Sequence, residues 1–383
     1  MLTEIWNYKY LRRIDFRAIV VVLSLMTVSL MIMSSVDYYH NQEDYTTFTL
    51  FTPLVKSQLR SFGVGWVAFI FFVGFDYNKL REWTWIIYAI IIVCLAGLFF
   101  VGSMNKVNRW YWIPGINMAF QPSEYAKLTI VLALSWFLER CKGRSRSWTT
   151  VIGAGLIAGV PFLMILKQPD LGTALALIPI VMILFYFGDI HPLVLRIMSV
   201  FIVCIAAIVV LFFSGAVSHE EMRPYMTKVI KNYQYERLNP DTHHQRAAVT
   251  AIALGGVSGK GWHKSEYVSG GWLPAPHTDS VFSVAGEEFG LLGLLLILIL
   301  FYTLIYFSFQ VSAVAKDSFG CFLAAGVAVY LAVHIVINIG MMCGFLPITG
   351  VPLVMITYGG SSVLTVMIAL GILQSIYSRR FMF

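Results

Sequence analysis

Residues 16–35 read FRAIVVVLSLMTVSLMIMSS, and Arg17 is the one charged residue among them. A helix needs about 20 residues to cross about 30 Å of hydrocarbon, so this run is long enough to span a membrane once. A short basic segment with Lys9, Arg12 and Arg13 precedes it. The run is longer than the apolar part of a signal peptide and no small-x-small cleavage site follows it, so we interpret it as a retained first span.

The rest of the chain repeats this pattern. Hydrophobic residues make up 58% of the 383 residues and charged residues 12%, against about 25% charged in a typical soluble domain. We therefore predict an all-α, polytopic integral membrane protein that forms a single domain over residues 1–383. The expected spans number about ten and lie at about 16–36, 57–75, 83–102, 121–138, 149–166, 171–188, 193–213, 280–309, 319–344 and 357–378.

The distribution of basic residues predicts the orientation. With the N-terminus inside, the short inner segments hold most of the Lys and Arg residues, and the densest group is residues 140–146, RCKGRSR. The positive-inside rule then places both termini in the cytoplasm. The formal net charge of +7 belongs largely to these anchors, which argues against nucleic acid as a partner. The five cysteines lie in predicted spans or cytoplasmic ends, so we predict neither disulfides nor thiolate metal sites.

A long polar segment, residues 214–279, separates the seventh and eighth spans and is expected outside. Its first expected helix is amphipathic and lies on the membrane surface, because apolar residues recur at helical spacing: Met226, Val229, Ile230 and Tyr233. A second helix is expected over 245–254, before Gly255-Gly256. The following Gly259-Lys-Gly261 lacks the spacing and the Ser or Thr of a phosphate-binding loop. A loop of this length usually carries function.

Ionisable residues in or beside predicted spans are costly and tend to mark function. Glu124 and Lys127 open the fourth span and lie three residues apart, so they share a helix face and can pair. Such a pair either neutralises itself or serves a site. Asp170 precedes the sixth span, where it suits an ordinary helix cap as well as a functional role.

A third group of polar residues, His277-Thr-Asp279, ends the long outer loop. Asp279 meets water at the start of the eighth span, where a helix cap is the simplest interpretation. Glu287 and Glu288 follow about two turns deeper, a depth at which a polar seam would explain them. His277 has no His or Cys at ligand spacing, so a structural role is favoured over a metal ligand.

Taken together, these groups resemble the SEDS family of RodA and FtsW proteins, and the chain length is closer to RodA. The matching stretches run in order along nearly the whole chain: Asn108-Arg-Trp110, Gln121-Pro-Ser-Glu124 with Lys127, Gln168-Pro-Asp-Leu-Gly-Thr-Ala174, Gly255-Gly256 with Gly259-Lys-Gly261, Leu273-Pro-Ala-Pro-His-Thr-Asp279, Gly286-Glu-Glu288, Leu346-Pro-Ile-Thr-Gly350 and Tyr358-Gly-Gly-Ser-Ser362. Two positions depart from the family pattern. Ser280 stands where Phe is usual, and Val354-Met-Ile-Thr357 replaces the usual Pro-Phe-x-Ser.

The resemblance implies a peptidoglycan glycosyltransferase of the bacterial inner membrane that polymerises lipid II for cell elongation and shape. Asp279 matches the family's essential acidic position and is assigned as the base. Glu124 and Lys127 match the pair that lines the family's outward-facing cavity. The resemblance leaves open whether Asp170 has a structural or a functional role. It also groups His277 with the residues of the cavity. A class B penicillin-binding protein is the implied partner, in membrane lipid.

The implied reaction inverts an α-linked diphosphate into a β-1,4 glycoside, so one base suffices and the leaving group needs charge stabilisation. Arg109, Lys127 and Arg246 are the candidate cations for the pyrophosphate. A divalent cation, Mg²⁺ or Mn²⁺, shared between phosphates and a carboxylate is equally compatible with the sequence.

Two alternatives to a polymerase remain. A lipid II flippase would line a path with polar span residues such as Asn338, but the charged groups crowd one side of the membrane and no internal repeat is visible. A non-catalytic scaffold for a penicillin-binding protein is kept open by the departures at Ser280 and Val354.

Overall fold

The computed structural model describes residues 6–40, 50–100, 109–113, 118–168, 170–215, 219–228, 235–236, 239 and 241–381. Within these ranges ten helices contain 17 residues or more, one for each predicted span, with ends that differ by a few residues. They are α2 (Phe16–His40), α3 (Pro53–Gly74), α4 (Tyr77–Gly97), α5 (Pro122–Arg140), α6 (Trp148–Lys167), α7 (Leu171–Phe187), α8 (Pro192–Phe213), α13 (Val281–Val314), α14 (Ser318–Met342) and α15 (Gly360–Ser378).

The helical membrane architecture predicted from the sequence is confirmed. Eight helices in the described part of the chain are long and apolar enough to cross a membrane by length and composition. The other two are α7, which has 17 residues, and α5, which carries Glu124, Lys127, Glu139 and Arg140. The number of crossings and their orientation stay predictions.

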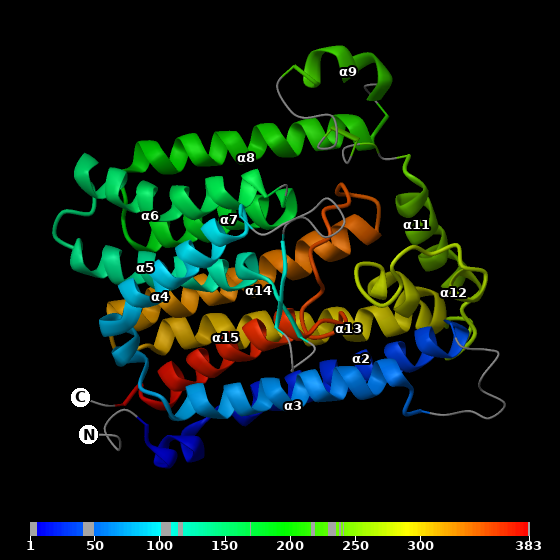
Figure 1. Cartoon of the computed structure of the whole chain (residues 1–383), viewed down its shortest axis with the longest axis horizontal. Coiled ribbons are helices and arrows are strands. Elements are labelled where there is room, and N and C mark those ends of the chain that lie inside the picture. The colour runs from blue at the N-terminus through cyan, green and yellow to red at the C-terminus, as the bar shows by residue number, and fades with distance from the viewer. Residues whose placement is uncertain are drawn as a thin grey trace.

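Helices α14 and α15 are largely buried in the bundle, whereas α13 packs beside α14 and leaves one face exposed. In Figure 1, α13, α14 and α15 run between α2 and α3 on one side and α5 to α8 on the other. Helix α15 packs on α3, α13 packs on α14, and α14 also contacts α5 and α7. Helix α8 lies at the edge and exposes apolar side chains such as Ile197, Phe201 and Val203, as a surface in contact with lipid requires.

The first and last described elements meet at one end of the bundle. Helix η1 (Tyr8–Arg13) packs on α3 and α15. Arg379, immediately after α15, is almost fully buried and donates hydrogen bonds to the carbonyl oxygens of Val73 (3.2 Å) and Gly74 (2.8 Å). Its guanidinium also lies 4.1 Å from the centre of the Tyr10 ring. The two ends of the described chain therefore lie on the same side of the bundle (Figure 1).

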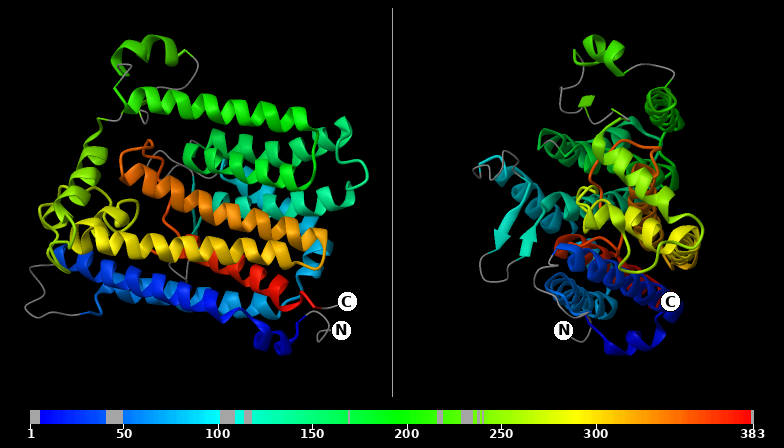
Figure 2. Two further views of the ribbon diagram at one scale, coloured as in Figure 1. Left: turned by 180° about the vertical axis from the view of Figure 1, so that it is seen from behind. Right: turned by 90° about the vertical axis from the view of Figure 1, so that its right-hand side faces the viewer.

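The opposite end, which we call the outer end, carries most of the described long polar segment. It holds α9 (His219–Met226), α11 (His243–Gly255) and α12 (Glu266–Ser269), as both views in Figure 2 show. The helix predicted over 245–254 is therefore confirmed as α11. The predicted surface helix cannot be followed beyond α9 and residue 228, because Val229, Ile230 and Tyr233, together with Lys231, lie outside the described residues.

A two-stranded antiparallel hairpin, which the sequence analysis did not predict, leads into α5. Its strands are β1 (Tyr111–Ile113) and β2 (Met118–Phe120), with Tyr111 opposite Phe120. The Tyr111 hydroxyl donates a hydrogen bond to the Cys94 carbonyl oxygen at 2.8 Å, which fixes the hairpin against α4.

Helix α13 is broken at Gly290, where φ is +64°. The loop 256–261 lies against the break and replaces the missing helical hydrogen bonds. Lys260 N and Gly261 N donate to the carbonyl oxygens of Glu287 (3.0 Å) and Glu288 (2.9 Å). A side chain at Gly259 or Gly290 would overlap the other segment's backbone. The glycine-rich motif after α11 is thus a packing motif that allows close backbone contact.

The acidic pair of α13 forms the polar seam expected from the sequence. Glu287 is fully buried and accepts hydrogen bonds from Ser265 Oγ (2.5 Å) and Glu266 N (2.8 Å), at the start of α12. Glu288 accepts a hydrogen bond from the Ser35 hydroxyl of α2. The pair therefore ties the outer loop to the spans, and a structural role accounts for both glutamates.

Candidate active site

Asp279 lies at the outer end, one residue before Ser280 and the start of α13. The three consecutive carbonyl oxygens of residues 277–279 each accept a hydrogen bond from a different group: Tyr358 N (3.0 Å), Thr357 Oγ1 (3.2 Å) and Asn338 Nδ2 (3.2 Å). The backbone that carries the half-buried Asp279 side chain is therefore held on three sides by groups distant in sequence.

Ser280, not Asp279, occupies the N-cap position of α13, and its side chain makes no capping hydrogen bond. The interpretation of Asp279 as a helix cap is therefore wrong. Ser280 Oγ instead donates to the Pro274 carbonyl oxygen at 2.7 Å, and His244 Nε2 of α11 lies 2.7 Å from the same hydroxyl. Because Ser280 gives its proton to Pro274, His244 is the donor in the second bond. Burial, followed by the charge of neighbouring His243, lowers the pKa of His244.

The Asp279 carboxylate faces a second loop, residues 346–350. A side chain placed on Gly350 would meet Asp279 Oδ2 at 3.5 Å, so this oxygen lies beside the Gly350 backbone. The neighbouring Thr349 contacts the start of α7, where a side chain on Gly172 would come within 2.7 Å of its carbonyl oxygen. This loop thus lies between Asp279 and the segment that carries Asp170.

Asp170 combines a helix cap with a polar cluster. Its Oδ1 accepts a hydrogen bond from Thr173 N (3.4 Å), so the cap predicted for α7 is present. Its Oδ2 accepts from Ser123 Oγ (3.1 Å) and Gln121 Nε2 (3.4 Å) at the start of α5. The same carboxylate therefore joins the N-termini of two helices.

Arg109 reaches the same cluster from the segment before β1. Its guanidinium donates through Nε to the Gln168 carbonyl oxygen at 3.2 Å, and its Nη1 lies 4.0 Å from Asp170 Oδ1. The structure therefore brings together two of the predicted site residues, Arg109 and Asp170. Asn108 and Pro169 of the matching motifs lie outside the described residues.

Glu124 and Lys127 form the predicted pair deep in the bundle, where they are 3% and 1% exposed. Lys127 Nζ lies 2.7 Å from Glu124 Oε1 and 2.6 Å from His334 Nε2 of α14. His334 Nδ1 faces the Tyr330 carbonyl oxygen at 2.8 Å, so Nδ1 carries the proton and Nε2 accepts from Lys127. Glu124 Oε2 and the Tyr330 hydroxyl are buried, and no described residue gives either atom a hydrogen-bond partner.

A polar stripe on α14 connects this pair to Asp279. Tyr330, His334 and Asn338 are four residues apart, so they lie on one face of the helix. His334 contacts Lys127 at one end of the stripe, and Asn338 contacts the Asp279 carbonyl oxygen at the other. The sequence analysis missed His334. The four-residue spacing of polar side chains in an apolar span was the signal that pointed to it.

The remaining predicted site residues lie at the outer end. The His277 ring packs edge-on against Tyr358, with 5.9 Å between the ring centres. Arg246, on α11, forms an ion pair with Asp241 at 2.9 Å and is well exposed. Arg109 lies beside Asp170 and Lys127 pairs with Glu124, so among the described residues the three predicted cations each face a different carboxylate.

The described residues contain no group of three or more His, Cys, Asp and Glu side chains arranged to hold a metal ion. The described part of the chain therefore offers no ready-made cage for a divalent cation. A cation at Asp279 would take most of its ligands from substrate phosphates, as Mg²⁺ commonly does.

The long apolar helices and the buried charged residues between them define a polytopic membrane protein with a polar site inside the bundle. The profile of a family described as "Cell cycle protein", which covers FtsW, RodA and SpoVE, matches residues 16–380. The chain therefore belongs to this family, also called the SEDS family, as the sequence motifs predicted.

Its curated relatives include peptidoglycan glycosyltransferase MrdB of Escherichia coli, which is 32% identical over 330 residues, 85% of this chain and 86% of that protein. Stage V sporulation protein E of Bacillus subtilis is 28% identical over 95% of this chain and 98% of that protein. The fold matches that of Thermus thermophilus RodA with a TM-score of 0.68 at 21% identity, over 97% and 98% of the two chains.

A second solved structure, described as "Structural coordination of polymerization and crosslinking by a peptidoglycan synthase complex", matches with a TM-score of 0.74 at 24% identity. The match covers 97% of this chain and 99% of that one. At these identities the two structures support the fold alone, and the RodA-like fold is thereby confirmed.

Proposed function

We propose that this chain is a peptidoglycan glycosyltransferase that polymerises lipid II for cell elongation and shape. Family membership and the names of curated relatives such as MrdB support this activity. We place the protein in the bacterial inner membrane with both termini in the cytoplasm, so that the outer end faces the cell wall.

The observation that carries the proposal is the position of Asp279. Its backbone is fixed by three hydrogen bonds and its carboxylate lies beside the Gly350 backbone, at the outer end of the helices. A general base must hold one geometry relative to its substrate, because small displacements of reacting groups cost large factors in rate. A carboxylate on a fixed backbone at the outer end of the helices meets that demand for a sugar attached to a membrane lipid.

In the proposed reaction Asp279 takes the proton of the acceptor sugar hydroxyl. The hydroxyl oxygen forms a bond to the anomeric carbon of the donor sugar, and the bond from that carbon to the diphosphate oxygen breaks. Undecaprenyl pyrophosphate leaves with the bonding electron pair. A single displacement inverts the anomeric carbon, so an α-linked donor gives the β-1,4 glycoside without a covalent enzyme intermediate.

The leaving diphosphate needs positive charge more than it needs a proton. We assign this task first to Arg109, which is partly exposed and reaches toward Asp170 at the limit of an ion pair. Lys127 is the second cation and shares its charge with Glu124. Arg246 is the third and weakest candidate, because Asp241 already neutralises it.

Glu124 and Lys127 act in this proposal as positioning groups of the cavity. Asp170 holds Arg109 and the start of α5, and His277 holds Tyr358 beside the base through its ring and its carbonyl oxygen. The reaction is therefore assigned to one base, a cation or cations near Asp170, and a buried charged pair.

The partner we propose is a class B penicillin-binding protein, which would crosslink the strands. The support is the structural likeness to a peptidoglycan synthase complex whose description joins polymerization to crosslinking. Lipid II and membrane lipid complete the list of partners, and we expect no binding of nucleic acid.

The test is polymerisation of lipid II by the purified protein in detergent, with and without the co-purified partner. We expect glycan ladders from the wild type and none from Asp279→Asn, which keeps the size of the side chain but cannot accept the proton. Asp189→Asn is the matched control, because Asp189 forms an exposed ion pair with Arg146 away from the site.

Three results would contradict the proposal. Glycan ladders of normal length from Asp279→Asn would rule out Asp279 as the general base. A wild type that moves labelled lipid II across vesicle membranes, yet never lengthens glycan even with its partner, would instead support a flippase. A protein that did neither and still bound the partner would support a scaffold.

A further inference from the structure

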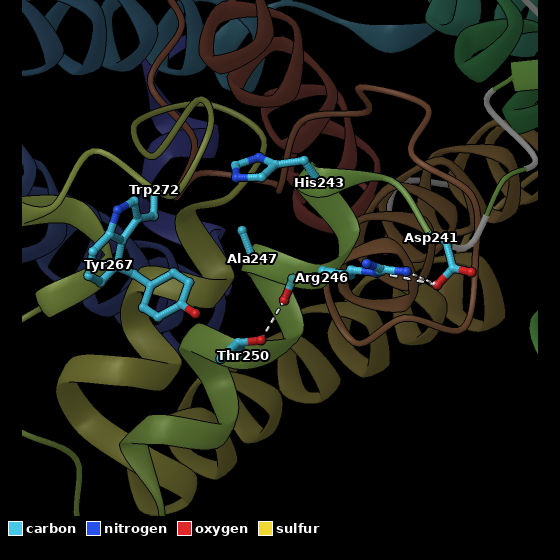
Figure 3. A pocket seen from close by; sticks show the side chains of 7 residues that line it. All are labelled: Asp241, His243, Arg246, Ala247, Thr250, Tyr267 and Trp272. Carbon is cyan, nitrogen blue, oxygen red and sulfur yellow. Dashed lines mark hydrogen bonds and ion pairs between the residues drawn. The ribbon is translucent and has the colours of Figure 1, made fainter.

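The outer end contains a pocket of about 380 Å³ between α11 and the loop that follows α12. Figure 3 shows its lining: Asp241, His243, Arg246 and Thr250 on the α11 side, and Tyr267 and Trp272 on the other. None of these residues takes part in the reaction as proposed, apart from the weakest cation candidate, Arg246. The pocket is therefore a candidate site for a ligand group other than the reacting atoms.

Both walls of the pocket are fixed. Thr242 caps α11 by accepting a hydrogen bond from Gln245 N at 3.3 Å, and residues 243, 246 and 250 fall on one face of that helix. On the other wall, Trp272 N and Leu273 N both donate to the Tyr267 carbonyl oxygen, at 3.0 and 3.1 Å. The pocket is thus a preformed feature of the loop, as small-ligand sites usually are.

The aromatic wall consists of two rings in an edge-to-face contact. The rings of Tyr267 and Trp272 are 5.4 Å apart and inclined by 75°, and Trp272 is 55% exposed. The faces of aromatic rings carry negative charge density, which attracts the weakly positive C–H groups on the flat side of a pyranose ring. An exposed indole beside a phenol is therefore suited to a sugar.

The polar wall presents hydrogen-bonding groups without a strong net charge. Arg246 and Asp241 neutralise each other at 2.9 Å, yet each keeps further donor or acceptor positions. His243 adds an imidazole ring. The Thr250 hydroxyl donates within α11 to the Arg246 carbonyl oxygen at 2.7 Å and keeps its acceptor positions. Such a wall suits the hydroxyl and acetamido groups of a sugar better than a diphosphate, which would require unpaired positive charge.

The pocket is coupled to the proposed base by two routes. Trp272 lies seven residues before Asp279 on the same loop. That loop is closed by the bond from Ser280 Oγ to the Pro274 carbonyl oxygen. Helix α11 lines the pocket with His243 and Arg246, and binds Ser280 through His244 between them. The pocket and the proposed base therefore belong to one connected part of the outer end.

We propose that this pocket binds a sugar unit of the glycan strand beyond the reacting residue and so retains the strand between rounds of addition. The choice of ligand rests on the proposed function. Trp272 and Tyr267 supply the sugar platform, and the Arg246–Asp241 pair supplies the hydrogen bonds. The site determines how long the product grows, while Asp279 determines whether a bond forms.

The first test measures binding without turnover. The full-length Asp279→Asn protein in detergent is titrated by calorimetry with a lipid-free tetramer of β-1,4-linked N-acetylglucosamine. We expect saturable binding that Trp272→Ala weakens by about tenfold or more, as aromatic anchors of binding sites typically do. Trp272→Phe, which keeps an aromatic face, should lose much less.

Trp148→Ala is the control for this titration, because Trp148 is equally exposed, at 54%, but lies at the start of α6. It should bind like the parent. Absence of binding to the parent, or equal binding by Trp272→Ala, would overturn the proposal. Displacement of the tetramer by inorganic pyrophosphate, dependent on Arg246, would overturn it in favour of an anion site.

The second test measures product length in the lipid II reaction. Trp272→Ala should shorten the glycan ladders several-fold while lipid II is consumed within about threefold of the wild-type rate. Unchanged ladders, or complete loss of consumption, would contradict the assignment. If the wild type makes no glycan at all, the proposed function fails, and the titration still decides whether the pocket binds sugar.

Discussion

Asn338 donates a hydrogen bond from its side-chain amide to the backbone carbonyl oxygen of Asp279, at 3.2 Å. The same amide donates to the Val351 carbonyl oxygen at 2.8 Å, at the edge of the loop that contains Gly350. One fully buried side chain of α14 therefore fixes the segment with the proposed base and the loop that its carboxylate faces. The distance between the two segments depends on this residue.

Asn338→Leu, which keeps the size of the side chain, should lower polymerisation roughly tenfold to 100-fold. Two buried carbonyl groups would lose a partner, so we also expect a loss of about 1–3 kcal/mol in stability. Glycan ladders and thermal unfolding in detergent measure the two effects. Thr84→Val is the control, because the buried Thr84 hydroxyl donates within its own helix, α4, to the Leu80 carbonyl oxygen at 2.6 Å. Normal activity in Asn338→Leu would rule out the coupling.

Lys127→Met should destabilise the protein by about 3–5 kcal/mol, because it leaves Glu124 buried without a cation. The double variant Glu124→Gln with Lys127→Met should recover most of that loss, since both charges are removed. We expect the double variant to stay inactive in lipid II polymerisation. If it folded well and also polymerised, the pair would be purely structural, which is the alternative that the sequence left open.

The helices were predictable because each apolar run is about as long as a membrane is thick, and that length is a local property of the sequence. The break in α13 could not be predicted in this way, because it depends on Gly259, in a loop about 30 residues earlier in the chain, lying against Gly290. The hairpin before α5 was missed for a similar reason. Its strands have only three residues each, too short for a periodic signal.

The residues of the candidate site likewise fall into those that local spacing predicts and those that depend on contacts distant in sequence. The Glu124–Lys127 pair and the Asp170 cap follow from spacing along one helix, and both are present. His334 was missed because its partner, Lys127, is 207 residues away. The spacing of Tyr330, His334 and Asn338 marks a polar face of the helix but does not show which residue contacts it. Arg246 was grouped with the other cations by charge alone, whereas its ion pair with Asp241 depends on the fold of the outer loop.

Acidification should destabilise the loop around Asp279 through His244. Its pKa is lowered by burial from an ordinary 6.5, so the folded protein favours the neutral ring. The stabilisation that results is fully present above pH 6.5 and is lost as the pH falls through the lowered pKa of the folded state. The thermal midpoint of the wild type should therefore fall across this window more than that of His244→Gln, which keeps a donor near Ser280.

The difference should amount to a few degrees at most, because His244 is only half-buried and solvent screens its charge. His243→Gln should weaken the effect, because the charge of the exposed His243 ring is the second cause of the lowered pKa of His244. Parallel pH profiles for wild type and His244→Gln would show that another group governs the acid sensitivity.

Gly255 should tolerate no side chain, because a Cβ there would overlap the Gly286 carbonyl oxygen at the crossing of α11 and α13. Neither backbone can yield easily, since Gly286 would in turn press on Ile252 and the loop 256–261 fixes the next turn of α13. Gly255→Ala should therefore push α11 away and separate His244 from Ser280. We expect a fall in the thermal midpoint of several degrees and a loss of most polymerisation.

Gly159→Ala in α6 is the matched variant, because nothing lies within 4 Å of the added Cβ. Alanine favours a helix over glycine by about 1 kcal/mol, so this change should leave the midpoint unchanged or raise it, with normal ladders. The two variants add the same methyl group. Opposite changes in their thermal midpoints would therefore identify the α11–α13 contact as the cause. Equal behaviour of the pair would mean that the close approach at Gly255 does not position the loop of Asp279.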